Sequence, residues 1–166
     1  MKISVGRIIS FVSVLFWCVS AQNSEEDYLK VHNAARKGVG VKPLKWDKEL
    51  ESYARAHLNK HAEDCKLESS EGPYGENLVL GTGIWKNLTG KEVVELWVSE
   101  KQYYDEKSNS CLGGDDGDDD KCFGYTQVVW STTTHVGCAR VRCYNGSIMV
   151  SCNYNPPGNY RDKRPY

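Results

Sequence analysis

Two histidines four residues apart are the first side chains whose spacing could do chemistry. His57 and His61 share one face of a predicted helix, and imidazole pairs at this spacing hold zinc in some metalloproteases. Leu58, however, stands where such a protease carries its catalytic glutamate. We therefore expect packing or surface roles for both histidines, and also for His32 on the inner stripe of an earlier helix. His135 lies in a polar turn and supports no function.

A carboxylate on an apolar helix face is the next candidate. Val93, Leu96, Trp97, Glu100 and Tyr104 fall on one stripe at helical spacing. A carboxylate there costs free energy unless it is paired, hydrogen-bonded or exposed to a wet cavity. Glu100 is therefore expected to be either a hydrogen-bonded structural residue or part of a cleft.

Other patterns argue against further chemistry. The sequence has no G-x-S-x-G elbow for a hydrolase nucleophile. The acidic run from Asp115 to Asp120 lacks the alternating ligands and the terminal glutamate of an EF-hand. We expect this run to be a solvated, mobile loop.

Helices that would position these side chains are predicted from their capping signals. Ser24 and the acidic residues after it resemble a capping box, and the helical pattern that follows ends at Gly38. Asp47 can cap a second helix that we expect to end near Cys65. Thr89, with a glutamate three residues later, begins the helix that carries Glu100.

A hairpin is predicted near the C-terminus. The dipeptide Asn145-Gly146 joins strand-like runs 136–144 and 147–154, which indicates a type I′ turn. This register brings Cys138 within one residue of facing Cys152, so a Cys138–Cys152 disulfide is the easier choice. Cys143 is then left for Cys65, and Cys111–Cys122 would close the loop between them. Six cysteines allow many connectivities, so the pairing stays open at this point.

The first 21 residues are typical of a secretory signal peptide. Lys2 and Arg7 precede an apolar run over 8–19, with Ser20 and Ala21 at the cleavage-type positions. The run is too short to span a membrane. We expect cleavage before Gln22 and a soluble, exported domain over 22–166.

Composition limits the partners of the mature chain. Removing Lys2 and Arg7 from 21 basic residues leaves 19, against 22 acidic residues, so nucleic acid is disfavoured. Loss of Cys18 from seven cysteines leaves six, and an even count in an exported chain indicates three disulfides.

Four ordered segments carry a family resemblance. They are "VHNAAR" at 31–36, "YGENL" at 74–78, "YTQVVW" at 125–130 and "VSCNYNPPGNY" at 150–160. Together they resemble the CAP superfamily of cysteine-rich secretory, antigen 5 and pathogenesis-related class 1 proteins. The linking stretches "VGVKPLKWD", "ELWVSEKQYYD" and "VGCARVRC" are most similar to plant pathogenesis-related class 1 proteins. The resemblance covers essentially all of 22–166 and implies an α+β fold, a three-layer α-β-α sandwich with disulfides.

The resemblance also implies a central cleft lined by two histidines and two glutamates that bind divalent metal in some members. The glutamates correspond to Glu76 and Glu100, whereas Glu68 and Gly124 stand at the two histidine positions. We therefore predict no zinc site of the family type, because imidazole suits zinc and carboxylates suit harder cations. Mutual repulsion among Glu68, Glu76 and Glu100 should raise the pKa of at least one of them. A weak calcium or magnesium site formed by these three carboxylates is the alternative.

The same resemblance bears on the tail. Residues 152–166 match a pattern implied to release a C-terminal defence-signalling peptide, with the junction between Asn155 and Pro156. The alternative is a tail, 156–166, that only packs across the sandwich. By sequence, Asn87 and Asn145 are glycosylation acceptors.

The combined prediction is a secreted, apoplastic plant defence protein that acts as a monomer. It would bind sterol or a related lipid, with peripheral membrane contact and antifungal action, and without a cofactor. The implied partners of the released peptide are a protease and a receptor. The alternative function is a metal-dependent hydrolase or protease of CAP type using Glu76 and Glu100, which the missing histidines disfavour.

Overall fold

A computed structural model describes residues 23–112 and 121–166. The predicted signal peptide and the acidic run from Asp115 to Asp120 lie outside the described residues. Four strands form the main sheet in the order β1-β5-β6-β2. Their bounds are Lys45–Trp46 for β1, His135–Arg142 for β5, Ile148–Asn155 for β6 and Gly75–Gly81 for β2. β6 is antiparallel to both β5 and β2, whereas β1 runs parallel to β5.

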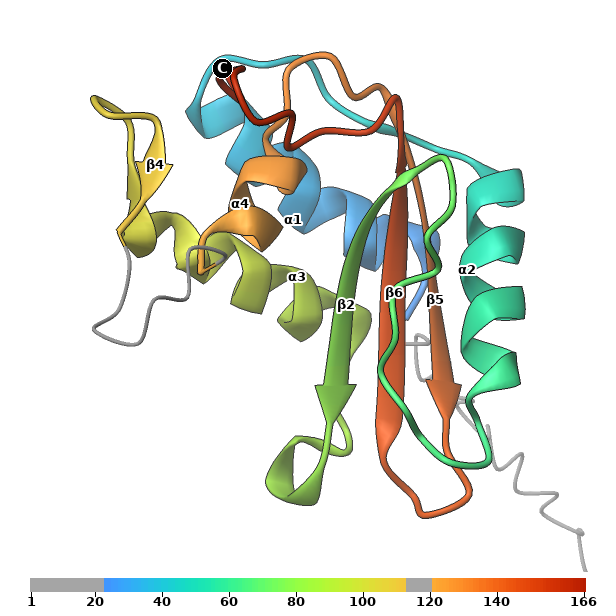
Figure 1. The fold of residues 1–166 in the computed structure, drawn as a ribbon. Coiled ribbons are helices and arrows are strands. Elements are labelled where there is room, and N and C mark those ends of the chain that lie inside the picture. The colour runs from blue at the N-terminus through green and yellow to red at the C-terminus, as the bar shows by residue number, and fades with distance from the viewer. Residues whose placement is uncertain (1–22, 113–120) are drawn as a thin grey trace, which may run out of the picture.

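Helices cover both faces of this sheet (Figure 1). Helix α2 (Lys48–Lys60) packs on one face against β5 and β6. The opposite layer contains α1 (Glu25–Gly38), α3 (Gly90–Ser99) and the short α4 (Phe123–Val128). This arrangement confirms the predicted α+β, three-layer α-β-α sandwich.

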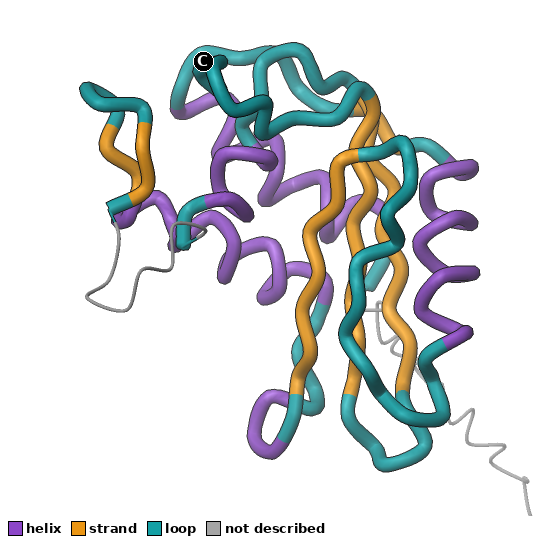
Figure 2. Tube along the Cα trace, viewed as in Figure 1, coloured by secondary structure: helices purple, strands orange, loops and turns teal. Residues whose placement is uncertain are grey.

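Short elements complete the described chain. They are the 3-10 segments η1 (Gly83–Trp85) and η2 (Glu100–Tyr103), and the two-stranded ladder of β3 (Tyr104–Asp105) with β4 (Ser110–Cys111). Loops between the layers gather at one end of the sandwich, next to the C-terminus (Figure 2). There the Ser131 N–H donates to the Pro165 carbonyl at 2.7 Å. Among the described residues, no helix is long and apolar enough to cross a membrane.

The helix starts agree with their capping signals, but one helix end differs. Ser24 and Thr89 complete capping boxes, and the Asp47 side chain accepts from the first turn of α2. The expectation that α2 continues to near Cys65 was wrong, because the helix ends at Lys60. The His61 N–H donates to the Leu58 carbonyl in a tighter turn, and Cys65 adopts φ 58°, which no helix can continue.

The hairpin forms with a different turn and register from those predicted. Cys138 faces Cys152 directly in the β5-β6 register, not one residue away. The type I′ assignment was wrong, because in the turn only Gly146, with φ 84°, has a positive φ. The Gly146 N–H donates to the Cys143 carbonyl, and the Cys143 N–H donates to the Ser147 carbonyl. This is a turn followed by a left-handed glycine, the bulged form of a hairpin loop.

Three disulfides join the elements. They are Cys65–Cys143, Cys111–Cys122 and Cys138–Cys152, the pairs expected above. The first ties the segment after α2 to the hairpin, and the third joins β5 to β6. Cys138 and Cys152 lie in the main core beneath α1 and α3, whereas Cys65 and Cys143 belong to the core beneath α2.

A buried arginine holds the short helix α4 in place. The Arg36 guanidinium, on α1, donates to the carbonyls of Lys42, Val128, Trp130 and Thr133 at 2.6–3.0 Å. A buried cation is tolerated here because its hydrogen-bonding capacity is used on backbone oxygens, including that of Val128 at the end of α4. The position of Gly124 relative to the sheet thus depends on α1.

Candidate functional site

Glu100 and Gly124 lie in direct contact. Glu100 begins η2, immediately after α3, and its Oε2 accepts a hydrogen bond from the Tyr125 N–H at 3.1 Å. A Cβ added at Gly124 would lie 2.6 Å from this oxygen and 2.9 Å from Trp97 Cδ1. The Glu100 carboxylate therefore fills the space into which a side chain at position 124 would project. Burial raises the pKa of Glu100 to about 6, and backbone hydrogen bonds from Tyr125 and Gly124 partly offset this effect.

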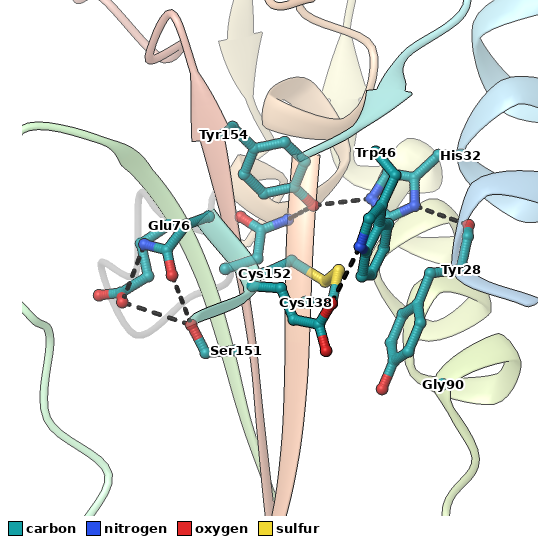
Figure 3. The surroundings of a disulfide bond; sticks show 12 residues. Tyr28, His32, Trp46, Glu76, Gly90, Cys138, Ser151, Cys152 and Tyr154 are labelled. Atoms are coloured by element: carbon teal, nitrogen blue, oxygen red, sulfur yellow. Dashed lines mark hydrogen bonds between the residues drawn. A yellow bond between two sulfur atoms is a disulfide. The ribbon is translucent and has the colours of Figure 1, made fainter. Parts of the chain in front are cut away.

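Glu76 is held by a separate set of donors (Figure 3). Its Oε2 accepts from the Ser70 N–H at 2.8 Å and the Ser69 hydroxyl at 3.2 Å. Its Oε1 accepts from the Asn153 amide at 3.3 Å and the Ser151 hydroxyl at 3.4 Å. Glu76 thus joins the loop before β2 to strand β6, and its lone pairs are largely occupied.

Glu68 lies apart from the other two carboxylates. Its side chain is exposed and forms an ion pair with Lys66, which lowers the pKa of Glu68. Its backbone carbonyl is 2.7 Å from His57 Nε2, so His57 fastens this loop to α2. His61 stacks edge-on against His57 at the end of the same helix. These contacts are structural.

The expected cluster of three carboxylates does not form. Glu68 pairs with a lysine, and the raised pKa of Glu100 comes from burial, not from repulsion by Glu68 or Glu76. No group of three or more His, Cys, Asp or Glu side chains able to hold a metal occurs in the described ranges. Glu68, Glu76 and Glu100 therefore do not form the calcium or magnesium site that was the alternative prediction. The residues at the four family positions also do not fit zinc, because none supplies an imidazole.

Behind the two glutamates, a buried polar chain joins α1, β6, β2 and α4. His32 Nδ1 donates to the Tyr28 carbonyl at 2.8 Å, so Nε2 accepts from the Tyr154 hydroxyl at 2.9 Å. The Asn77 amide donates to Tyr154 at 3.2 Å and to the Gly124 carbonyl at 3.0 Å. Burial lowers the pKa of His32 to about 4, which keeps the imidazole neutral.

The sequence predicted a packing or surface role for His32, and the structure shows it buried, but the sequence gave no indication of Asn77 and Tyr154. Their positions in the sequence gave no signal, since the partners are 77 and 122 residues apart. Alternation within β2 could only have shown that Asn77 faces a different side from Glu76.

A groove lies between α4 and the C-terminal tail. Its volume is about 580 Å³. The α4 side includes Phe123, Thr126 and Trp130, and the tail side includes Asn159, Tyr160 and Pro165. Phe123 and Tyr160 are large apolar side chains that remain exposed, at 45% and 47%. Of the aromatic residues expected to line a binding surface, Trp130 lines this groove, whereas Trp97 is buried in the core and Tyr103 lies outside the groove lining.

The tail is attached at both ends. The Asn155 carbonyl accepts from the Thr134 N–H at 3.1 Å where β6 ends. Pro165 is buried, and the Tyr166 hydroxyl lies 3.2 Å from that of Tyr125. Both predicted glycosylation acceptors, Asn87 and Asn145, are exposed.

Comparison with known proteins gives a consistent family match. The model of the CAP, cysteine-rich secretory protein family matches residues 29–154. Pathogenesis-related protein 1A of Nicotiana tabacum is 49% identical over 162 residues, covering 98% of this chain and 92% of the relative. Pathogenesis-related protein 1 of Arabidopsis thaliana is 45% identical over 171 residues and the full length of both chains.

Solved structures agree with the fold. The crystal structure of Na-ASP-1 has a TM-score of 0.72 and 25% identity, covering 91% of this chain and 44% of that chain. Schistosoma mansoni venom allergen-like protein 4 has a TM-score of 0.64 and 28% identity, covering 86% of this chain and 94% of that one. With the α-β-α sandwich and the three disulfides, these matches show that the chain belongs to the CAP family, and within it is similar to plant pathogenesis-related class 1 proteins.

Proposed function

We propose that this protein is a secreted plant defence protein that acts by binding a sterol or related lipid in the groove between α4 and the C-terminal tail. The names of its plant relatives support the defence role, and the family name supports secretion. The protein would act in the extracellular space of the plant, the apoplast, as a monomer that contacts fungal or other membranes peripherally.

The groove is the observation that carries this proposal. Its volume of about 580 Å³ falls within the range of roughly 300–1,000 Å³ that is usual for small-molecule sites. Phe123, Trp130 and Tyr160 provide apolar surface, while Thr126 and Asn159 provide polar groups that could orient a sterol hydroxyl. Phe123 and Tyr160 remain exposed and line this groove, which supports an apolar ligand, while Arg161 and Lys163 add positive charge to the lining.

A titration of the oxidised mature chain, 22–166, with a fluorescent sterol tests this function. We expect saturable binding that is unchanged by added divalent metal, because the family metal positions lack their histidines. Phe123→Ala and Tyr160→Ala should each weaken binding by about tenfold, the loss that corresponds to removing one buried aromatic contact.

Matched controls separate the groove from general surface effects. Tyr144→Ala removes an aromatic ring that is 82% exposed on the hairpin loop, and Trp85→Ala removes one that is 53% exposed in η1. Both should leave sterol binding unchanged. Absence of sterol binding, or equal losses in all four variants, would contradict the proposal.

Release of a C-terminal peptide is a second candidate, supported by the exposure of Asn155, Pro156 and residues 160–164. A protease would then have to open the hydrogen bond between Thr134 and the Asn155 carbonyl, and a separate receptor would read the peptide. Mass spectrometry of the apoplastic fluid of challenged tissue should detect a peptide beginning at Pro156. Its absence there, with the intact protein present, would remove this candidate.

The hydrolase alternative gains no support from the geometry. Glu76 is occupied by four donors, and Glu100 is shielded by contact with Gly124 and by its bond to Tyr125. A general acid and base need free access to substrate protons. We therefore infer that this cleft is structural and that the protein acts by binding.

A further inference from the structure

A second cavity lies on another part of the molecule, beside the N-terminus of α1. Its volume is about 230 Å³, and its lining includes Tyr28, Trp46, Glu51, Arg55 and Arg140. It shares no lining residue with the sterol groove. The inference drawn from it is therefore independent of the proposed function.

Tyr28, which lines this cavity, has a hydroxyl group without a hydrogen-bond partner among the described residues. Tyr28 is only 2% exposed, and its hydroxyl is the buried side-chain polar atom, among the described residues, that has no hydrogen-bond partner. Leaving such a group unpaired costs free energy, so a native structure that retains one calls for a reason. Burial raises the pKa of Tyr28 to about 12, so at neutral pH the group is a hydrogen-bond donor.

Tyr28 is one of the residues that line the cavity, and its ring lies against Gly90. A Cβ added at Gly90 would lie 2.3 Å from Tyr28 Cζ, the ring atom that carries the hydroxyl. The Gly90 N–H donates to Asn23, which lines the cavity. In Figure 3 the hydroxyl end of Tyr28 points away from His32. The glycine thus leaves room for the hydroxyl end of the ring.

Arg140 brings a positive charge to the same cavity, and it forms no ion pair with any described residue. Its Nε donates to the Leu88 carbonyl at 2.9 Å, and in the described ranges neither a carboxylate nor a hydrogen bond engages its terminal nitrogens. The charges of Arg140 and Arg55 act to lower the pKa of Tyr28, as expected for guanidinium groups near its hydroxyl. Arg140 itself has a lowered pKa because of burial and the nearby Arg142.

The two carboxylates of the lining are already neutralised. Glu51 accepts from Lys48 at 3.0 Å, from Arg55 at 3.2 Å and from the indole N–H of Trp46 at 3.1 Å. Glu25 is also paired with Lys48. Arg140, a cation, and the Tyr28 hydroxyl, a neutral donor, are therefore the lining groups available to a ligand. Together they suit an anionic oxygen.

We propose that this cavity binds a small organic carboxylate, with the Tyr28 hydroxyl and the Arg140 guanidinium holding its oxygens and Trp46 forming an apolar wall. The volume of about 230 Å³ lies below the usual range for drug-sized ligands, which restricts the ligand to a small acid. A guanidinium fork matches a carboxylate with two parallel hydrogen bonds, which favours this group over a single-atom anion.

Benzoate is the probe, and the oxidised mature chain labelled with ¹⁵N is the sample. We expect saturable shifts of the Trp46 indole resonance and of the Asn23 and Gly90 amides, with a Kd on the order of 1 mM or below. Benzamide, which has nearly the same shape without the charge, should bind at least tenfold more weakly. Tyr28→Phe and Arg140→Gln should each weaken benzoate binding by about tenfold or more.

Two controls distinguish a site from a structural effect. Arg142→Gln removes an equal charge two residues along the same strand, where the side chain bonds to Gly146 and Asn87 outside this cavity. Benzoate affinity should stay within about twofold of the unmodified chain in this variant. Tyr28→Phe should keep the melting temperature or raise it, because the hydroxyl it removes has no partner.

The benzoate titrations have results that support the carboxylate site and results that refute it. Loss of benzoate binding in Tyr28→Phe and Arg140→Gln, with Arg142→Gln unaffected and the fold intact, supports the site. Equal binding of benzamide would refute recognition of the carboxylate. No saturable shift with benzoate, or shifts that persist in both cavity variants, would overturn the proposal.

Discussion

At the scale of single residues, Gly124 and Glu100 show how a site position can change its role. The sequence showed that an imidazole is missing at 124, but not what fills the space. The structure places the Glu100 carboxylate there, with only 2.6 Å available to a Cβ on Gly124. A carboxylate that could serve a metal thus becomes a contact between η2 and α4, and it carries a penalty for burial.

Glu100 should give the protein a specific pH dependence. Its folded-state pKa of about 6 lies above the ordinary glutamate value of 4.5, so the folded state retains the proton more strongly. Stability is therefore fully present below about pH 4.5 and declines as pH rises through about 6. After a discount for partial solvent exposure, the loss should be about 1 kcal/mol.

Glu100→Gln should remove this decline, because an amide does not titrate and its oxygen can still accept from Tyr125. Urea unfolding between pH 4 and pH 8 would measure the difference. Glu95→Gln, which changes an exposed carboxylate on the preceding helix, is the control and should keep the decline of the unmodified chain. Parallel profiles for the unmodified chain and Glu100→Gln would contradict the assignment.

At the scale of elements, local signals in the sequence decided where helices begin. Ser24, Asp47 and Thr89 all cap as predicted, because a capping bond forms within three residues and depends on little else. The ends of helices and the type of the hairpin turn were less predictable. The end of α2 and the hairpin turn depend on the loop that Cys65–Cys143 ties down, a contact between segments 78 residues apart.

Thr89→Ala tests the contribution of one cap. The Thr89 hydroxyl accepts from the Glu92 N–H at 3.3 Å, and the backbone N–H of Thr89 donates to the Glu92 carboxylate at 2.8 Å. The substitution should reduce the free energy of unfolding by about 1 kcal/mol. Chemical denaturation would measure this, with Thr82→Ala as the matched control.

Thr82 precedes η1 in the same way but makes no capping hydrogen bond. Its substitution should change stability by less than about 0.5 kcal/mol. Equal losses in the two variants would show that the cap of α3 contributes nothing measurable.

At the scale of the whole molecule, the C-terminal tail is part of the folded domain. The Tyr166 hydroxyl lies beside that of Tyr125, and the Pro165 carbonyl accepts from the Ser131 N–H. The Gly158 N–H donates to the buried Gln127 side chain at 2.9 Å. The tail also forms one side of the groove that is proposed to bind sterol. Peptide release and lipid binding would therefore exclude one another in a single molecule.

A chain that ends at Asn155 should be less stable and should not bind sterol. Loss of the buried Pro165 and of the hydrogen bonds made by Tyr166 and Gly158 should cost on the order of 3 kcal/mol. Thermal unfolding and the sterol titration would measure both effects. Tyr166→Phe, which removes only the terminal hydroxyl, should retain sterol binding. Normal sterol affinity in the truncated chain would place the lipid site elsewhere.

The amino-acid sequence was enough to predict the helix starts, the disulfide count, the layered fold through its family resemblance, and the lack of histidines at the metal positions. These features depend on local hydrogen bonds, composition or contiguous motifs. Only the tertiary structure decided that Glu68, Glu76 and Glu100 do not converge, that Asn77 and Tyr154 link His32 to α4, and that Tyr28 meets Arg140 at a cavity. Such contacts join distant segments, and their geometry is set by the packing of the layers, which no local pattern encodes.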